Sequence, residues 1–551
     1  MNKRHSWKSG KNFTRRLSKL LLVCLVLLII RPIQAESFDT RIDAMTLEQK
    51  VAQMFVVSFF GSTVNIPTRD FIRTWQPGII VLLPSNLENP SQITRLTNDI
   101  QQILLDADSV PAFIAVDQEG GIIAHLDEGF TRWAVPSLLT ATQDTNLAYQ
   151  FGEALATEIR AVGINMNLAP VADLLTNRDN PIIGRRSFGT YPEQVAPIII
   201  AVINGMQSNG VMATSKHFPG HGDTESDSHL TLPVISYSQQ ELESRELIPF
   251  QAAIEAETGA IMVAHIVFPE LQTDDSLPAS LSPDIVTGLL RETMGYNGLI
   301  ITDALDMDAI DTVFSPQDAA VQAVIAGNDM LIIAAHLSLD GQAAAMQAVV
   351  DAVRSGQISE SQIDASVERI LSAKERFGVL NWEQLDPLTA STRIDTETHT
   401  QLVERIFAAG ITIVRGQAML PLPANTAFIV PASRGTLRTQ CQQNEWQIVG
   451  VSDNPSDDEI AWARQASQQA DVTVVFTANA ADSPQQQRLV AALPAEKTMV
   501  IALWSPYDNL VLPATSGYMV TYSPLRQAYS PICAILLGEA PAQGTLSVAL
   551  Q

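Results

Sequence analysis

The sequence predicts an α/β protein made of two domains, an N-terminal (β/α)8 TIM-like barrel and a C-terminal α/β sandwich domain. Between residues 36 and 378, eight short apolar runs alternate with longer amphipathic ones. Strands that are apolar almost throughout are typical of a parallel sheet that helices cover on both faces. From residue 394 to residue 551 the alternation resumes with six further apolar runs, which predicts a second α/β domain.

The eight expected barrel strands are residues 51–60, 78–83, 112–116, 164–168, 211–215, 260–264, 298–302 and 330–334. Eight such strands in one segment fit a closed barrel in which a helix follows each strand. The last helix of this domain has a clear start, since Ser359 and Gln362 match a capping box and Ile363 and Val367 begin an apolar stripe. Gly378 marks its expected end.

We therefore expect the barrel in residues 36–378, a linker in residues 379–393 and the accessory sandwich domain in residues 394–551. The linker contains the turn signal Asp386-Pro387. The expected strands of the accessory domain are residues 411–415, 427–430, 447–451, 472–477, 499–503 and 518–521, with a helix over 457–470. The sequence of this domain has no glycine-rich phosphate loop, so a nucleotide site has little support.

Residues 1–35 are predicted to be a signal peptide. They carry eight basic residues, no acidic residue and an apolar run at 20–30, and they end on Ala35. Eleven apolar residues are too few to span a bilayer comfortably. We expect an exported protein, located in the periplasm, outside the cell or at the cell envelope, whose mature chain begins at Glu36. The alternative of an uncleaved leader that anchors the chain stays open. Lipidation at Cys24 is disfavoured by the bulky Val23 before it.

The charge balance excludes some classes of partner. The 34 Lys and Arg residues face 59 Asp and Glu residues, which gives a net charge of −25. A chain of this charge repels phosphate backbones and anionic membrane surfaces. We therefore expect no nucleic-acid partner, and membrane contact only through an uncleaved leader.

Cysteine usage leaves one question open. Beyond the leader only Cys441 and Cys533 remain, and both a disulfide and two buried thiols are compatible with cysteines so far apart. No Cys/His spacing of the zinc type occurs in the sequence, so we expect neither a metal ion nor a cofactor.

Polar side chains follow five of the eight expected barrel strands. They are Asp117, Asp173, the pair Lys216 and His217, His265, and Asp303. One such residue alone is more often a cap or a member of an ion pair. The carboxyl ends of barrel strands meet at one rim, however, and this rim carries the chemistry of barrel enzymes. Five polar strand ends therefore predict an active site.

The segment 216–229 is the most informative stretch, because three of the eight histidines of the chain fall within it. Pro219 and Gly220 exclude the helical spacing of a metal site. In an extended segment residues two apart lie on the same side, so Asp227 can hold the ring of His229, fix its tautomer and raise its pKa. This arrangement suits a general acid/base on a glycine-rich loop.

This loop is similar to the signature of glycoside hydrolase family 3, in its β-N-acetylglucosaminidase branch. The resemblance continues at residues 117–121, 167–173, 184–189 and 301–307, and it covers the whole barrel in family order. The second domain resembles the accessory domain of the two-domain members, notably at Ser505-Pro506-Tyr507-Asp508.

The resemblance implies a role for each matching residue. Asp303 would be the nucleophile, and His229 with Asp227 the general acid/base. The residues implied to hydrogen-bond the terminal sugar are Asp117, Arg186, Lys216 and His217. The residues expected to shape the site rather than react are His221, Asp223 and His265.

The chain departs from the family pattern at one place. After Gly121 the family usually continues with arginines, one of which reaches the terminal sugar, whereas this chain has Ile122-Ile123-Ala124-His125. His125 is therefore a predicted substrate-binding residue with a shorter reach and no permanent charge. The exact sugar preference stays open at this point.

Together with the predicted leader, the resemblance implies an exported, retaining exo-β-N-acetylglucosaminidase of the β-N-acetylhexosaminidase type. It would release terminal β-linked N-acetylglucosamine from peptidoglycan fragments through a covalent sugar adduct on Asp303. Substrate-assisted hexosaminidases use a carboxylate pair, which Asp303 followed by Ala304 does not provide. Two enzyme alternatives are a phosphorylase, since a neutral histidine base does not repel phosphate, and a β-glucosidase of the same family. A non-catalytic sugar- or cell-wall-binding protein would be expected to have lost Asp303 or His229.

Overall fold

The computed structural model describes residue 1 and residues 38–224, 232–334, 336–441 and 446–550. The chain divides into two compact units, residues 1–45 and residues 46–551. In the first unit, helix α2 spans Phe38–Ala44. The fold described below is that of the second unit. Within the described residues, no helix combines the length and the apolar composition that a membrane crossing requires.

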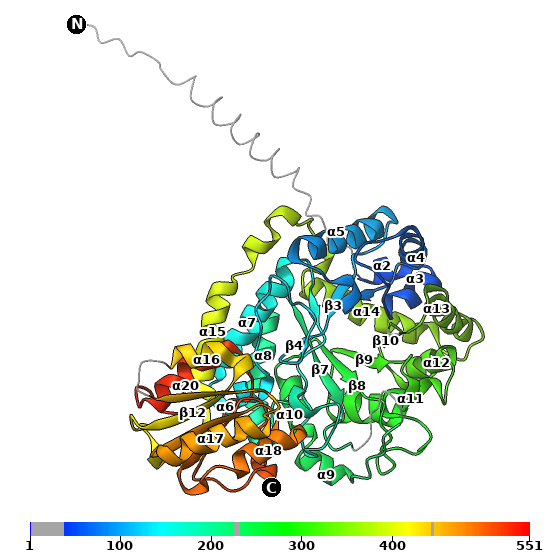
Figure 1. Cartoon of the computed structure of the whole chain (residues 1–551). Helices are drawn as coiled ribbons and strands as arrows, with labels where there is room; N and C mark the ends of the chain where they lie inside the picture. Colours follow the sequence, from blue (N-terminus) through cyan, green and yellow to red (C-terminus); the bar gives the residue numbers. More distant parts are fainter. Residues whose placement is uncertain (2–37, 225–231, 335, 442–445, 551) are drawn as a thin grey trace. The chain divides into compact units, whose positions relative to one another are not determined.

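Eight parallel strands close into a barrel in the order β1-β10-β9-β8-β7-β6-β3-β2. Figure 1 shows these strands at the centre, with helices around them. The strands are β1 (Phe55–Val57), β2 (Ile79–Val81), β3 (Phe113–Val116), β6 (Met166–Asn167), β7 (Met212–Phe218), β8 (Ala260–Val263), β9 (Leu299–Ala304) and β10 (Met330–Ile332). Each of the eight predicted strands is present, and the predicted barrel is confirmed.

The helices follow the barrel strands in turn. They are α3 (Leu47–Gln53), α4 (Ile66–Trp75), α5 (Pro90–Asp106), α6 (Pro136–Thr142), α7 (Thr145–Ala161), α8 (Pro192–Ser208), α9 (Gln239–Ser244), α10 (Leu247–Glu255), a π-type helix (Asp284–Thr293), α11 (Asp308–Asp311), α12 (Pro316–Ala326), α13 (Leu339–Arg354) and α14 (Glu360–Arg376). Helix α14 ends before Gly378, whose φ of 71° lies in the left-handed region that favours glycine.

Local interactions change one predicted boundary and one predicted cap. The first expected strand, 51–60, begins too early, because Thr46 and Gln49 form a capping box that starts helix α3 and keeps residues up to Gln53 helical. Ser359 caps α14 as predicted, but the Gln362 amide donates to the carbonyl of Val324 at 2.6 Å. The reciprocal half of that predicted capping box is therefore missing.

One element of the barrel region was not predicted. After β3 the chain forms an antiparallel hairpin of β4 (Gln118–Gly120) and β5 (Ile123–Ala124). Its strands are too short for a periodic pattern, and the polar sequence of β4 resembles a loop.

The C-terminal part forms a six-stranded sheet in the order β11-β16-β15-β14-β12-β13. Its strands are β11 (Thr412–Arg415), β12 (Thr426–Pro431), β13 (Gln447–Val451), β14 (Val472–Thr477), β15 (Thr498–Ala502) and β16 (Gly517–Val520). All neighbours are parallel except β11 and β16. The predicted second α/β domain is confirmed.

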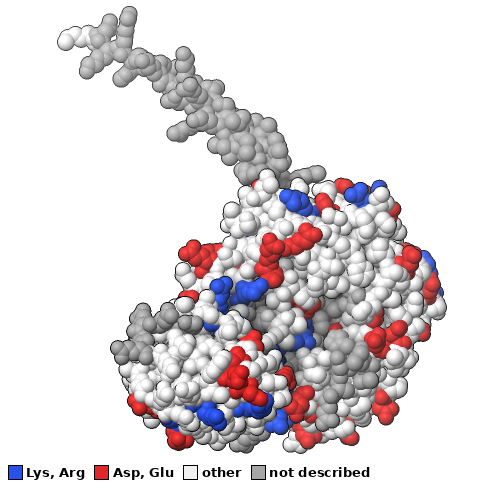
Figure 2. All heavy atoms as spheres, in the orientation of Figure 1, with Lys and Arg blue, Asp and Glu red and all other residues white. Residues whose placement is uncertain are grey.

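Helices accompany this sheet, and Figure 1 shows α16 and α20 on one side of β12 and α17 on the other. The helices of this part are α15 (Thr396–Gly410), α16 (Gly435–Gln440), α17 (Asp457–Gln469), α18 (Pro484–Ala491), α19 (Asp508–Val511) and α20 (Tyr529–Leu536). Figure 2 shows acidic side chains spread over the visible face rather than gathered in one patch.

The two cysteines beyond the leader are paired. Cys441, at the end of α16, forms a disulfide with Cys533 in α20, with 5.4 Å between their Cα atoms. The bond joins residues 92 positions apart in the sequence. The alternative of two buried thiols is therefore wrong for this structure.

Reduction of this disulfide is expected to destabilise the protein. A closed loop of about 90 residues restricts the unfolded chain, and its loss costs up to about 4 kcal/mol in the loop-entropy description. We expect a reductant to lower the melting temperature of the wild type but not that of the Cys441→Ala, Cys533→Ala double variant. Reaction of both cysteines with a thiol reagent in the unfolded, unreduced protein would contradict the pairing.

Candidate active site

A cavity of about 210 Å³ opens at the carboxyl ends of the barrel strands. The polar residues that line it are Asp117, Arg186, Lys216, His217, His221 and Asp303. Five of the residues predicted from the sequence are thus brought together: the expected nucleophile and four of the expected sugar ligands. Leu168, Met262 and Ile332 supply part of the apolar wall.

The remaining three predicted site residues are one described residue outside this lining, His125, and two residues on which the structure is silent. Asp227 and His229, the expected general acid/base pair, lie outside the described residues. His125 follows β5 and is half-buried beside the cavity, where its backbone N–H donates to the carbonyl of Asp117 at 3.3 Å. Burial lowers the pKa of His125, while the charge of Asp117 opposes this shift and that of Lys216 adds to it.

Glu119 organises the cationic side of the cavity, although the sequence analysis assigned it no role. Its buried carboxylate accepts from Arg186 Nε at 2.9 Å and from Arg186 Nη2 at 2.7 Å. It also lies 2.9 Å from Lys216 Nζ, which in turn donates to Asp117 Oδ1 at 2.6 Å. The two basic side chains are therefore held in place by a carboxylate that does not itself line the cavity.

The opposite charges in this network shift one another's pKa values toward the charged forms. Burial alone would raise the pKa of Glu119, but Lys216 and Arg186 lower it to about 2. Burial would likewise lower the pKa of Lys216, yet Asp117 and Glu119 raise it above its usual value. Glu119 is thus a carboxylate and Lys216 an ammonium at neutral pH, and the cavity keeps a permanent set of charged hydrogen-bond donors.

Asp173 fixes the two histidines at the start of the loop after β7. Its buried carboxylate accepts from the backbone N–H groups of His217 at 3.1 Å and His221 at 2.7 Å. His217 Nδ1 lies 2.7 Å from the same carboxylate, so this nitrogen carries the hydrogen and Nε2 is left for the cavity. Burial and the charge of Arg186 hold the pKa of His217 well below its usual range, and the ring is neutral.

The side chain of Asp303 is an ionised carboxylate at neutral pH. Burial raises the pKa of Asp303, but several polar neighbours of this carboxyl group oppose the effect. The N–H of Ala304, which donates to Asp303 Oδ1 at 2.8 Å, and the ammonium of Lys216 act in the same direction. The resulting pKa of Asp303 is about 2. Such a carboxylate can attack an electrophilic carbon without first losing a proton.

The remaining expected residues make contacts within the protein. His221 Nδ1 lies 3.0 Å from the hydroxyl of Thr224, and Asp223 accepts from the hydroxyl of Tyr237 at 2.5 Å. His265 Nε2 lies 2.9 Å from the carbonyl oxygen of Ala304, to which it donates, and thereby supports the backbone next to Asp303. Among the residues that the structure describes, no group of His, Cys, Asp and Glu side chains has the arrangement of a metal site.

Comparison with known proteins agrees with this geometry. Residues 46–373 match the family model described as "Glycosyl hydrolase family 3 N terminal domain". The chain belongs to glycoside hydrolase family 3. Both the predicted family and the prediction of a glycoside hydrolase are confirmed.

Two relatives show which members of the family this glycoside hydrolase is similar to. It is 30% identical to "Beta-hexosaminidase A" of Pseudoalteromonas piscicida, with 87% of this chain and 90% of that protein covered. It is 34% identical to a family 3 β-N-acetylglucosaminidase from Paenibacillus sp. str. FPU-7, with a TM-score of 0.80 and coverage of 92% of this chain and 99% of that one. A β-glucoside phosphorylase, BglX, has a TM-score of 0.79 at 22% identity, a likeness of fold alone.

Replacing Glu119→Gln is expected to lower kcat/KM on a chromogenic β-glycoside by about 10- to 100-fold. The substitution keeps the shape but removes the charge that orients Arg186 and Lys216, and hydrogen bonds to charged groups are worth about 1.5–3 kcal/mol. Asp127→Asn, which removes a carboxylate from the exposed pair with Arg132, is the matched control and should have little effect. An unchanged kcat/KM in Glu119→Gln would show that Arg186 and Lys216 need no such support.

Proposed function

We propose that this glycoside hydrolase is an exported, retaining exo-β-N-acetylglucosaminidase that removes terminal β-linked N-acetylglucosamine, with peptidoglycan fragments as its natural substrates. The observation that carries the proposal is the small cavity of about 210 Å³ in which ionised Asp303 faces a fixed set of sugar-binding groups. A space of this size suits one terminal sugar and therefore exo-type cleavage. The names of the two relatives, a β-hexosaminidase and a β-N-acetylglucosaminidase, support the sugar assigned here.

The proposed reaction proceeds in two displacements at the anomeric carbon. In the first, Asp303 Oδ attacks this carbon and forms a glycosyl ester, while His229 donates a proton to the departing oxygen. In the second, His229 accepts a proton from water, which attacks the same carbon and releases Asp303. Asp227 holds His229 in the required tautomer. Two inversions leave the anomeric configuration unchanged.

The groups around the sugar have separate tasks in this proposal. Lys216 and Arg186 donate charged hydrogen bonds to sugar hydroxyls, and Asp117 accepts from them. His217 presents Nε2 as a neutral acceptor, because Asp173 holds its Nδ1 hydrogen. These contacts place the anomeric carbon over Asp303, which is the kind of positioning that converts binding energy into rate.

Export is supported by two features of the chain. Residues 1–35 have the composition of a secretory leader, and Cys441 and Cys533 form a disulfide. Disulfides persist in oxidising compartments outside the cytoplasm. Substrates in the cell envelope would be accessible to an enzyme in such a compartment.

The proposal is tested by hydrolysis of 4-nitrophenyl N-acetyl-β-glucosaminide beside the corresponding β-glucoside, each with and without phosphate. We expect faster cleavage of the first, free N-acetylglucosamine rather than a sugar phosphate, and the β-anomer as the first product. A fluorinated substrate should label Asp303, as located by mass spectrometry. A preference for the glucoside, a sugar 1-phosphate product or a label on Asp306 or Asp173 would each overturn part of the proposal.

Substitution of the acid/base residue gives a second, independent test. His229→Ala is expected to lose about 10²- to 10⁴-fold in rate on substrates with poor leaving groups and far less on nitrophenyl glycosides, because only a poor leaving oxygen needs protonation. Asp227→Ala should show the same pattern more weakly. Equal losses on all substrates would instead assign a structural role to this loop.

A further inference from the structure

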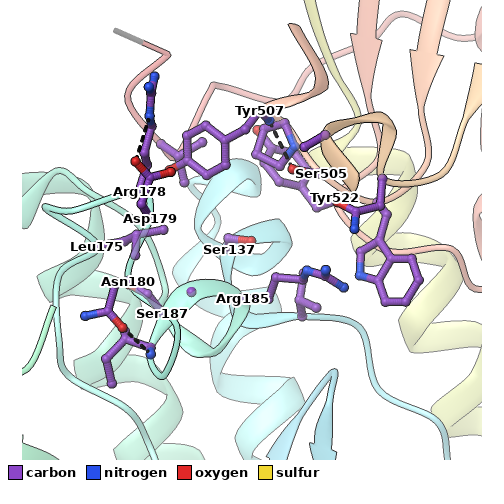
Figure 3. A pocket seen from close by; sticks show the side chains of 18 of the residues that line it. Ser137, Leu175, Arg178, Asp179, Asn180, Arg185, Ser187, Ser505, Tyr507 and Tyr522 are labelled. Atoms are coloured by element: carbon purple, nitrogen blue, oxygen red, sulfur yellow. Dashed lines mark hydrogen bonds and ion pairs between the residues drawn. The ribbon is translucent and has the colours of Figure 1, made fainter. Parts of the chain in front are cut away.

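A second, larger cavity of about 900 Å³ lies between the barrel and the C-terminal sheet (Figure 3). Most of its lining comes from residues 178–185 and Ser187 of the barrel and from the C-terminal segments 479–482 and 504–511. Ile182 lines both this cavity and the smaller one. The larger cavity has no role in the reaction described above.

The two cavities meet at a single turn of the chain. Arg185 lines the larger cavity and Arg186, the next residue, lines the smaller one. Both belong to the short 3-10 turn Gly184–Arg186, and successive Cα atoms are only about 3.8 Å apart. The larger cavity therefore begins within one residue of the group that is proposed to hold the terminal sugar.

The lining of the larger cavity contains unusually exposed apolar side chains. Ile122 is 51% exposed, Leu510 38% and Val511 41%. The aromatic residues Trp504 and Tyr507 lie in the same wall. Large apolar side chains that are exposed together around one cavity are typical of a ligand-binding site.

Arg185 is the distinctive polar group of this cavity. Its guanidinium stacks over the ring of Trp504, with 4.1 Å between the guanidinium carbon and the ring centroid. In Figure 3 the Arg185 side chain extends from the barrel turn toward the C-terminal side of the cavity. Burial lowers the pKa of Arg185, but an arginine keeps its charge at any pH at which the protein is folded.

The hydrogen-bonding capacity of Arg185 is unused in the described part of the chain. No hydrogen bond or ion pair within 4 Å joins its guanidinium to another described residue, although Asp482 and Asp508 attract it from farther away. A half-buried guanidinium has five N–H donors in a planar fork that matches a carboxylate. The nearby ring of Trp504 fixes the plane of this fork.

Two aspartates also line the cavity, and neither forms a direct ion pair with the Arg185 guanidinium. Asp179 is 82% exposed and lies 3.7 Å from Arg178. Asp482 accepts a hydrogen bond from the side-chain amide of Asn479. The cavity therefore combines an apolar and aromatic wall with the Arg185 guanidinium, which forms no direct ion pair with any residue that the structure describes.

We propose that this cavity binds the leaving group of the substrate, and that Arg185, braced by Trp504 of the C-terminal domain, selects leaving groups that carry a carboxylate and an apolar portion. A sugar bearing an acidic ether and an attached peptide has this chemistry. The inference rests on the proposed function, since it requires the terminal sugar to occupy the smaller cavity. It gives the accessory domain a direct part in substrate choice.

The test compares two disaccharides that differ only by one acidic group. N-acetylglucosaminyl-β-1,4-N-acetylmuramic acid carries a lactyl carboxylate that N,N′-diacetylchitobiose lacks. The quantity measured is the ratio of kcat/KM for the acidic substrate to that for the neutral one. We expect the wild type to favour the acidic substrate and Arg185→Gln to lower the ratio about tenfold or more, chiefly through a higher KM for the acidic substrate.

Matched variants separate this role from a general effect. Arg185→Lys keeps the charge without the planar fork and should retain part of the preference. Trp504→Leu removes the brace and should lower the same ratio. Arg526→Gln removes an exposed arginine of the C-terminal domain that lines neither cavity, and it should leave the ratio unchanged. Melting temperatures of all variants verify that each one folds.

The failure of this inference is distinguishable from the failure of the proposed function. An unchanged ratio in folded Arg185→Gln, with both disaccharides still cleaved, would overturn the role of Arg185 and leave the activity standing. No cleavage of either disaccharide or of 4-nitrophenyl N-acetyl-β-glucosaminide by the wild type would overturn the proposed function itself.

Discussion

The buried carboxylate of Glu119 is the constraint on which the active site depends. Two cations, Arg186 and Lys216, cannot share a cavity of about 210 Å³ without a counter-charge, because each would lose its hydration and repel the other. Glu119 accepts from both at 2.7–2.9 Å and thereby fixes where their remaining donors point. It stands two residues after Asp117, so the short segment that follows β3 supplies both the counter-charge and a carboxylate of the cavity wall.

Barrel closure brings these residues together from distant parts of the chain. Asp117 follows β3, Lys216 and His217 end β7, and Asp303 lies near the end of β9. The strands are short and buried, so they hold the backbone rigidly while their last residues face the cavity. Asp173, in the segment that follows β6, then holds His217 and His221 in place with three hydrogen bonds. Precision in the site is thus a consequence of a packed core beneath it.

Much of this arrangement could be predicted from the sequence. The parts that were missed share one physical cause. Apolar runs such as 330–334 identified the barrel strands because burial on both faces leaves a clear local signal. The polar ends of those strands identified Lys216 and Asp303. Glu119 could not be assigned, because its role depends on Arg186, 67 positions away. The Cys441–Cys533 pair was open for the same reason, with 92 positions between the cysteines.

The neighbouring arginines at 185 and 186 have their side-chain partners in two different domains. Arg186 is bound by Glu119, a partner that the barrel itself provides, and it would serve a barrel-only enzyme equally well. Arg185 has its stacking partner, Trp504, in the C-terminal domain. The barrel residues proposed to contact the terminal sugar can therefore stay fixed while loops of the second domain change what the larger cavity accepts. In the proposed function, the barrel therefore supplies the chemistry, and the surface that the two domains share selects the leaving group.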